Sequence, residues 1–270
     1  AARPEIDERF SRKADNVDWL ASLSYDLTAS DLLFASVSTG TKSGGFNGVA
    51  GATEEREFDD EDTISYELGL KSTLLDERLR LNSTLFLTEI NQLQSSQQAA
   101  SGLGQFTSNQ GEAEVSGVDL QLDALPASNL TLSLGVQYLH TYEFTEGPDK
   151  GLKLPYAAEL SGSLAATFAL PLADGSAYLR GDYTVMGNHW TNSASIGQLE
   201  DKDRQDRSNI NVTVGWRNDR WAISVWGKNL GDEEYAVQTL TPYPVTDTDA
   251  YFLTPPRTYG VTLRYDFDQG

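Results

Sequence analysis

Apolar and polar residues alternate one by one along most of this chain, and this period limits its possible folds more than any other feature. In one segment Ile64, Tyr66, Leu68 and Leu70 occupy every second position. About eleven segments share the period, including residues 17–27, 118–122, 130–138, 210–216 and 259–267. Successive side chains of a β-strand point to opposite faces, so each segment predicts a strand with one apolar and one polar face. The chain is therefore expected to be all-β.

The connections between these segments are of two kinds. The short ones are rich in Asp, Asn, Gly and Pro, as tight turns require, and span residues 28–31, 74–78, 126–129, 171–175 and 217–220. The long, polar ones span about 41–62, 91–112, 146–155, 191–206 and 231–256. Short and long connections alternate strictly. An antiparallel, up-and-down sheet is expected, with all short turns at one end and all long loops at the other.

Two all-β architectures fit this pattern. A soluble sheet, such as a carbohydrate-binding domain, would bury its apolar faces in a dry core. A transmembrane β-barrel needs only about 10 alternating residues per strand, with short periplasmic turns, long external loops and aromatic belts at both interfaces. Aromatic residues lie on the apolar face near short turns at Tyr25, Trp221, Tyr265 and Phe267, and toward a long loop at Tyr138 and Tyr142. The asymmetric connections and these aromatics favour the transmembrane barrel.

One strand loses its apolar face halfway along. Leu33, Ala35 and Val37 alternate with polar residues, and residues 41–48 then consist mainly of Gly, Ser, Lys and Asn. A barrel strand can leave the hydrocarbon and still remain in the sheet, because water then satisfies its outer surface. Residues 33–37 are expected to cross the bilayer, and residues 41–48 to continue above it.

Composition excludes several functions. The formal net charge of -20 argues against nucleic-acid binding. The absence of cysteine excludes disulfides and thiolate metal sites. The acidic run at residues 54–63 lacks the spacing of a known calcium loop and is interpreted as an external loop that faces solvent or lipopolysaccharide. His140 and His189, the only histidines, are expected on the apolar face, with no metal site.

No catalytic constellation is present, so neither an enzyme nor a cofactor is predicted. Asp119 and Asp123 share the polar face, as an acid–base pair would. Asp119 and Asp123 are instead expected to belong to a polar, lumen-facing barrel wall. Four basic residues are expected on the same wall and would offset them: Arg80, Arg180, Lys228 and Arg264.

The long loops contain the best ligand-binding candidates, because aromatic residues displayed on loops commonly contact ligands. These candidates are Trp190, Tyr243, Tyr251 and Phe252. The alternative is that the same aromatics pack the loops against each other.

Five stretches, in order, resemble the C-terminal half of the β-barrel of TonB-dependent outer-membrane receptors. They are "LLFASVSTGTKSGGFNG", "ISYELGLKSTLLDERLRLNSTLFLTEINQLQ", "EVSGVDLQLDALPASNLTLSLGVQYLHTYE", "WAISVWGKNLGDEEYAV" and "PPRTYGVTLRYDF". The resemblance implies a 22-stranded barrel filled by an N-terminal plug that couples to TonB. Residues 1–270 would form about half of that barrel, without the plug. Because the only methionine is Met186, Ala1 is not expected to be a translation start.

The resemblance also implies a function. The expected protein is a receptor of the Gram-negative outer membrane that imports a small molecule or metal chelate, with a ferric siderophore as the default substrate. Receptors for cobalamin or oligosaccharide share the same motifs, and a passive porin-like or structural barrel is the rival class. Eleven strands cannot close antiparallel on themselves. The edges near residues 17–27 and 258–267 should therefore lack partners, so this half should not be stable alone in a membrane.

Overall fold

The computed structural model describes residues 10–48, 56–98, 105–192, 204–240 and 250–267, and β-strands are the regular structure of these ranges. Eleven strands form one antiparallel sheet. They are β1 (Leu20–Asp26), β2 (Asp31–Lys42), β5 (Glu61–Leu74), β6 (Leu79–Asn91), β9 (Ala113–Ala127), β10 (Leu130–Phe144), β11 (Leu160–Leu172), β12 (Gly175–Trp190), β13 (Arg204–Arg217), β14 (Trp221–Lys228) and β17 (Thr258–Tyr265). Within the same ranges, no helix is long and apolar enough to cross a membrane.

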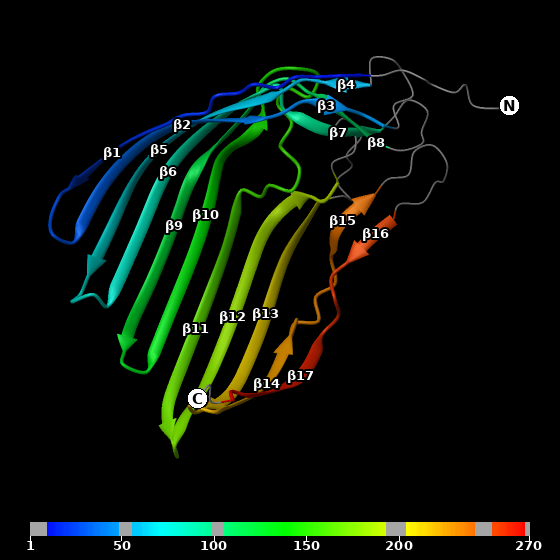
Figure 1. Cartoon of the computed structure of the whole chain (residues 1–270). Coiled ribbons are helices and arrows are strands. Elements are labelled where there is room, and N and C mark those ends of the chain that lie inside the picture. Colours follow the sequence, from blue (N-terminus) through cyan, green and yellow to red (C-terminus); the bar gives the residue numbers. More distant parts are fainter. Residues whose placement is uncertain (1–9, 49–55, 99–104, 193–203, 241–249, 268–270) are drawn as a thin grey trace.

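The strands follow one another in the sheet in chain order, so the all-β, up-and-down prediction is confirmed (Figure 1). Each predicted short connection joins two neighbouring strands at one end of the sheet. The long connections at the other end contain three further hairpins of two strands each. These pair β3 (Gly45–Phe46) with β4 (Glu57–Phe58), β7 (Gln94–Gln98) with β8 (Gln105–Asn109), and β15 (Ala236–Leu240) with β16 (Ala250–Leu253).

The longest strands have more residues than a bilayer crossing needs. β12 has 16 residues and β10 has 15, against the about 9–11 residues with which a strand tilted by about 45° spans a bilayer. β2 stays in the main sheet only up to Lys42, and Gly45–Phe46 form β3 in a separate sheet, so the predicted continuation of the strand over residues 41–48 is wrong beyond Lys42. The long-loop end of the sheet is therefore built partly from strand extensions.

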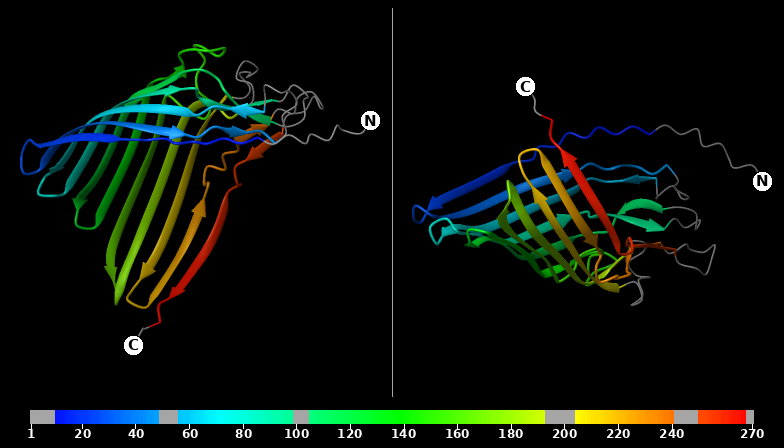
Figure 2. Two further views of the ribbon diagram at one scale, coloured as in Figure 1. Left: turned by 45° about the horizontal axis from the view of Figure 1, so that its top comes forward. Right: turned by 90° about the horizontal axis from the view of Figure 1, so that it is seen from below.

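Cross-strand pairing separates the residues of the sheet into two faces. The first face, called here the apolar face, joins Leu68 to Leu85, Leu85 to Val118 and Leu134 to Leu164. The second, called here the polar face, joins Asn82 to Gln121 and Gln137 to Ser161. The sheet bends into an open trough (Figure 2). Apolar-face side chains such as Leu85, 53% exposed, lack a protein layer over them in the described part of the chain. The described residues therefore form no dry core of the soluble kind over this face.

Two β-bulges change which face a residue occupies. In β10 the register shifts between Leu139 and Thr141, so Tyr142 pairs with Val115 on the polar face. In β12 it shifts between Met186 and His189, so His189 pairs with Gln205 on the polar face. Strict alternation had placed Tyr142 with Tyr138, and His189 with Tyr183, on the apolar face. Both predictions were wrong, because one extra residue in a bulge reverses the parity of everything beyond it.

Gly117 accommodates the bulge at His140. A Cβ at Gly117 would lie 2.1 Å from the backbone oxygen of Tyr138 and 3.1 Å from the Cα of Leu139. The bulged backbone of β10 therefore approaches β9 too closely for any side chain at this position. His140 itself is exposed, whereas Tyr142 beyond it is 6% exposed.

Most of the fully buried side chains gather where the strands meet the long loops. Among described residues, Phe144 is 1% exposed, and Thr191 and Thr239 are completely buried. Other buried members of this rim are Ala113, Leu139, Tyr142, Ala158, His189, Asn192 and Ala236. The main sheet is one layer thick, so its faces remain accessible, and the small core forms only where loop segments fold against strand ends.

The two edge strands are open, as the odd strand count predicts. In the described part of the chain, β1 pairs only with β2, and β17 pairs only with β14. β1 and β17 both run from the long-loop end toward the short-turn end, so they are parallel to each other. They cannot close this sheet by the antiparallel ladder that joins all the other strands.

Candidate functional site

The polar face carries all six wall residues predicted from sequence. Two of them are directly opposite each other, since Arg80 pairs with Asp123. The cross-strand registers place Asp119, Arg180, Lys228 and Arg264 on this same face. Their roles in the whole protein stay predictions, but their common orientation follows from the pairing.

Asp119 and Asp123 are engaged separately, and not with each other. The amide of Gln137 donates to Asp119 Oδ1 at 3.1 Å, and the hydroxyl of Ser133 donates to Asp123 Oδ1 at 2.6 Å. Two basic residues each bind an aspartate two positions further along the chain. Arg180 Nε lies 3.0 Å from Asp182 Oδ2, and Arg264 Nε lies 2.9 Å from Asp266 Oδ1. Because Asp119 and Asp123 bind separate partners, they fit a hydrogen-bonded wall and not an acid–base pair.

Aromatic rings lie over glycines on the polar face. Three directly opposed pairs repeat this arrangement: Phe34 with Gly69, Tyr178 with Gly215, and Trp226 with Gly260. A Cβ on the glycine would lie 2.3, 2.5 and 2.1 Å, respectively, from the opposing ring. A cation then stacks on each ring at 5.2–5.8 Å, namely Lys71 on Phe34, Arg217 on Tyr178 and Lys228 on Trp226. The rings thus lie flat along the wall instead of projecting from it.

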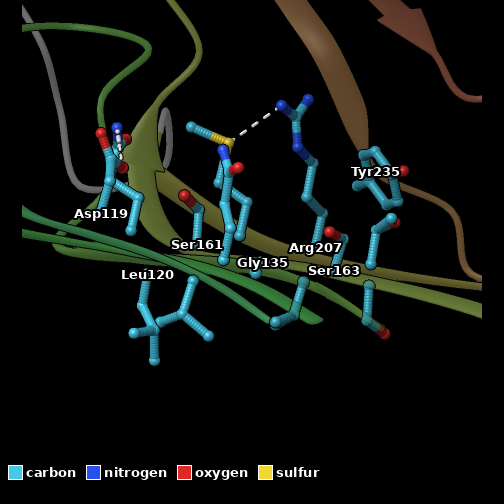
Figure 3. Close-up of a pocket in the computed structure, with 15 residues that line it drawn as sticks. Asp119, Leu120, Gly135, Ser161, Ser163, Arg207 and Tyr235 are labelled. Atoms are coloured by element: carbon cyan, nitrogen blue, oxygen red, sulfur yellow. Dashed lines mark hydrogen bonds between the residues drawn. The ribbon is translucent and has the colours of Figure 1, made fainter. Parts of the chain in front are cut away.

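A hollow of about 520 Å³ lies on the polar face toward the long-loop end (Figure 3). Its floor is lined by small or polar side chains of β9–β13, including Gln121, Gly135, Ser161, Ser163 and Thr184. Asp119 lies at one end and Arg207 at the other, while Leu120 points away to the opposite side of the sheet (Figure 3). Tyr235, from the segment between β14 and β15, lies beside Arg207.

Sequence reasoning missed Arg207, Met186 and Tyr235. Arg207 Nη2 donates to the sulfur of Met186 at 2.9 Å, and the Arg207 guanidinium lies 6.0 Å from the Tyr235 ring centre. A signal existed for Arg207, because it continues the polar-face positions Asn209 and Asn211 at period two. Nothing local indicated Tyr235, which reaches the hollow because its segment runs beside β13, where the Leu230 amide donates to the Ile210 carbonyl and the Ala236 amide to the Gln205 side chain.

The predicted loop aromatics occupy strand ends and a hairpin. Trp190 is the last residue of β12, with the guanidinium of Arg204 5.2 Å from its ring. Tyr251 and Phe252 lie in β16, 46% and 53% exposed. Thr239, which pairs with Tyr251, hydrogen-bonds Thr191, whose neighbour in the chain is Trp190, at 2.9 Å between hydroxyls. Tyr243 lies outside the described residues.

Two further long connections, residues 41–62 and 91–112, are joined to each other by amide side chains. Asn47 donates to the Thr107 carbonyl and accepts from the Thr107 amide, both at 2.8 Å. Asn109 bonds both backbone groups of Asp59. The β3–β4 and β7–β8 hairpins therefore form one hydrogen-bonded body at the mouth of the trough (Figure 1).

Carboxylates of the acidic run take part in contacts within this region. Arg12 donates to Asp59 and Asp60 at 3.2 and 2.9 Å, and the backbone amide of Gln94 donates to Glu61 at 2.6 Å. Among the described residues, no group of three His, Asp or Glu side chains could hold a metal ion. Asp59, Asp60 and Glu61 of the acidic run therefore make hydrogen bonds within the loop region. The sequence had predicted only a loop that faces solvent or lipopolysaccharide.

Aromatic side chains cluster on the apolar face near the short turns. Trp221 pairs with Tyr265, and their ring centres are 4.5 Å apart. Phe267 meets Tyr265 edge-on at 4.8 Å. All three rings remain accessible, from 37% for Tyr265 to 82% for Phe267. This arrangement fits an interfacial belt.

Comparisons with known proteins agree with this geometry. Residues 2–230 match the family described as TonB dependent receptor-like, beta-barrel. The ferric yersiniabactin uptake receptor FyuA from Yersinia pestis superposes with a TM-score of 0.76 at 21% identity, over 92% of this chain and 37% of its own. The closed form of the ferric-catecholate import receptor Fiu from E. coli K12 gives 0.67 at 20% identity, over 93% and 35%.

A third solved structure, the siderophore receptor PiuA from Acinetobacter baumannii, gives a TM-score of 0.68 at 16% identity, over 91% of this chain and 35% of its own. At such identities the likeness concerns the fold. The chain spans a little over a third of the length of each of these receptors.

Proposed function

The chain belongs to the TonB-dependent receptor family, and from this membership we propose that it forms part of the barrel wall of an outer-membrane receptor that imports a ferric siderophore. The observation that carries the proposal is the eleven-stranded sheet with one apolar and one polar face, short turns at one end and long loops at the other. An apolar outer band, a polar interior and this asymmetry of connections are what a bilayer demands of a barrel.

The open edges support completion by further strands. The backbone groups of β1 and β17 that face away from the sheet would be unsatisfied in lipid, at a cost of several kcal/mol each. We propose that about eleven more strands pair with these edges in a 22-stranded barrel. Lipid and lipopolysaccharide then surround the apolar face. A plug domain fills the trough and links the receptor to TonB.

The residues divide into two roles on this proposal. The wall residues Arg80, Asp119, Asp123, Arg180, Lys228 and Arg264 face the lumen and contact the plug. The loop aromatics Trp190, Tyr243, Tyr251 and Phe252 contact the substrate as it enters. A ferric siderophore is proposed as the cargo because the solved structures named above are a ferric yersiniabactin uptake receptor, a ferric-catecholate import receptor and a siderophore receptor.

Uptake by intact cells tests the proposal. The native protein is expressed in a Gram-negative host that lacks its own iron receptors, and iron-55 is supplied as a panel of chelates. We expect saturable uptake of at least one chelate that is lost when TonB is deleted or the proton gradient is collapsed. Uptake that rises linearly with concentration and does not need TonB would instead identify a passive barrel. Uptake of cobalamin or an oligosaccharide, with no iron chelate taken up, would correct the cargo.

A further inference from the structure

The guanidinium of Arg207 faces the hollow of the polar face, and no carboxylate of the described residues pairs with it. Its contacts there are the Met186 sulfur at 2.9 Å and the Tyr235 ring at 6.0 Å. No salt bridge joins it to any acid within the described ranges. A thioether is a weak acceptor, so the contact with Met186 satisfies little of the hydrogen-bonding capacity of an arginine.

Two other arginines of the polar face are paired with acids, whereas Arg80 and Arg217 form no salt bridge within the described ranges. Arg180 and Arg264 each have an aspartate two positions further along the strand, and each binds it. The residues two positions from Arg207 are Gln205 and Asn209. Asp206, the residue that precedes Arg207 in the chain, lies on the opposite face. With 40 acidic against 20 basic residues in the chain, the unpaired state of Arg207 does not reflect a shortage of acids.

The position of Arg207 suits a molecule that enters from outside. It pairs with Met186 near the long-loop end of β12, and Tyr235 comes from a loop segment. Small floor residues, Gly135, Ser161 and Ser163, leave the space in front of it open. Asp119 lies at the far end of the same hollow (Figure 3), so negative charge is attracted at the Arg207 end and repelled at the other.

We propose that Arg207, assisted by Tyr235, binds an anionic oxygen of the imported chelate, so that the substrate class is a ferric chelate carrying carboxylate or catecholate groups. This assignment rests on the proposed function. The guanidinium presents five donors in a planar fork that matches paired oxygens and keeps its charge at any working pH. Displacement of the Met186 sulfur by such an oxygen replaces a weak acceptor with a charged one.

Arg217 provides a matched control. It lies on the same face of the same strand and stacks on Tyr178 at 5.8 Å, but at the short-turn end of β13. Arg207→Gln and Arg217→Gln therefore remove the same group at the two ends of one strand. The probes are iron-55 as ferric citrate, as a tris-catecholate, as a neutral trihydroxamate and as cationic ferrioxamine. KM for uptake is measured in the native receptor, with its amount in the membrane used for normalisation.

We expect the wild-type receptor to take up an anionic chelate. Arg207→Gln should raise KM for this chelate about tenfold or more, because one charge-assisted contact is lost. Arg217→Gln should raise KM less than twofold. Tyr235→Leu leaves the charge in place and should raise KM about threefold through loss of the ring contact. It supplies a second variant if Arg207→Gln lowers the amount of receptor.

Three outcomes would overturn the assignment. One is a wild-type receptor that takes up only the neutral or cationic chelate, which leaves the proposed function standing. Another is an unchanged KM in both Arg207→Gln and Tyr235→Leu. The third is an equal loss of every chelate together with loss of folded protein in both variants, because Arg207 would then be a structural contact to the plug. A receptor that transports none of the four chelates would remove the proposed function itself.

Discussion

Met186 and His189 lie on the same face of β12 although they are three positions apart. Two residues, Gly187 and Asn188, oppose the single residue Asp206 between them, and the His189 ring nitrogen Nδ1 lies 2.8 Å from the Gly187 carbonyl oxygen. The bulge thereby directs His189, 3% exposed, into the buried rim. Regular alternation would have turned it toward the apolar face.

Deletion of Asn188 should therefore be tolerated. Removing the extra residue leaves Met186 opposite Arg207 and His189 opposite Gln205, so no side chain changes face. Deletion of Gly181, in the regular part of the same strand, should abolish folding. Every side chain of β12 on one side of the deletion would then move to the opposite face of the sheet. The measurement is the folded fraction of each variant, from the heat-dependent shift in gel mobility. Equal damage by the two deletions would show that the bulge is wrongly placed.

Gly69→Ala should destabilise the protein by about 1–3 kcal/mol. The new Cβ would meet two atoms of the Phe34 ring at 2.3 Å and the Ser83 carbonyl oxygen at 3.0 Å, so both the ring and the strand spacing would have to adjust. Gly181→Ala, where a Cβ would meet nothing within 4 Å, is the control and should be neutral. The measurement is the thermal midpoint of each variant in detergent. A tolerated Gly69→Ala would mean that the ring does not rest on the glycine.

Asp149 makes the stability of the external loop depend on pH. It is 9% exposed, and burial raises the pKa of its carboxyl above the ordinary value. The unfolded chain thus gives up this proton at lower pH than the folded one, so the contribution of Asp149 to stability falls as pH rises through this interval. At a pH below the ordinary pKa range of aspartate, the Asp149→Asn variant should be as stable as the wild type. At neutral pH it should be more stable than the wild type.

Thermal midpoints of detergent-solubilised protein, measured from acid to neutral pH, test this sign. Asp232→Asn is the control, because Asp232 is paired with Arg257 at 3.2 Å and half exposed, so its loss should not stabilise the protein at neutral pH. A variant Asp149→Asn that is less stable than the wild type at neutral pH would show that the carboxylate has a stabilising partner.

Residues 1–270 alone should not remain inserted in a membrane. Each edge strand would expose unpaired backbone groups to lipid, at several kcal/mol per group, against a total stability of about 5–15 kcal/mol for a typical domain. Secreted by itself, the segment should be extracted from membranes by urea and degraded. Stable, urea-resistant insertion of the segment as a monomer would exclude a need for further strands.

Local signals were enough for the strands and their order. Period-two alternation located the eleven main strands, and the length of each connection assigned its end of the sheet. The six wall residues fell on one face because they lie in regular stretches, where parity carries over from residue to residue. Motifs spread along the chain indicated the family that the comparisons then showed.

Contacts between distant segments decided what alternation missed. The sequence by itself determined strands, faces and the apolar band, because these depend on side-chain order within about ten residues. Only the tertiary structure turned Tyr142 and His189 inward, since a bulge exists only relative to the register of a partner strand. Only the tertiary structure brought Tyr235 beside Arg207, because the segment of Tyr235 runs beside β13 and so joins residues that no local period relates.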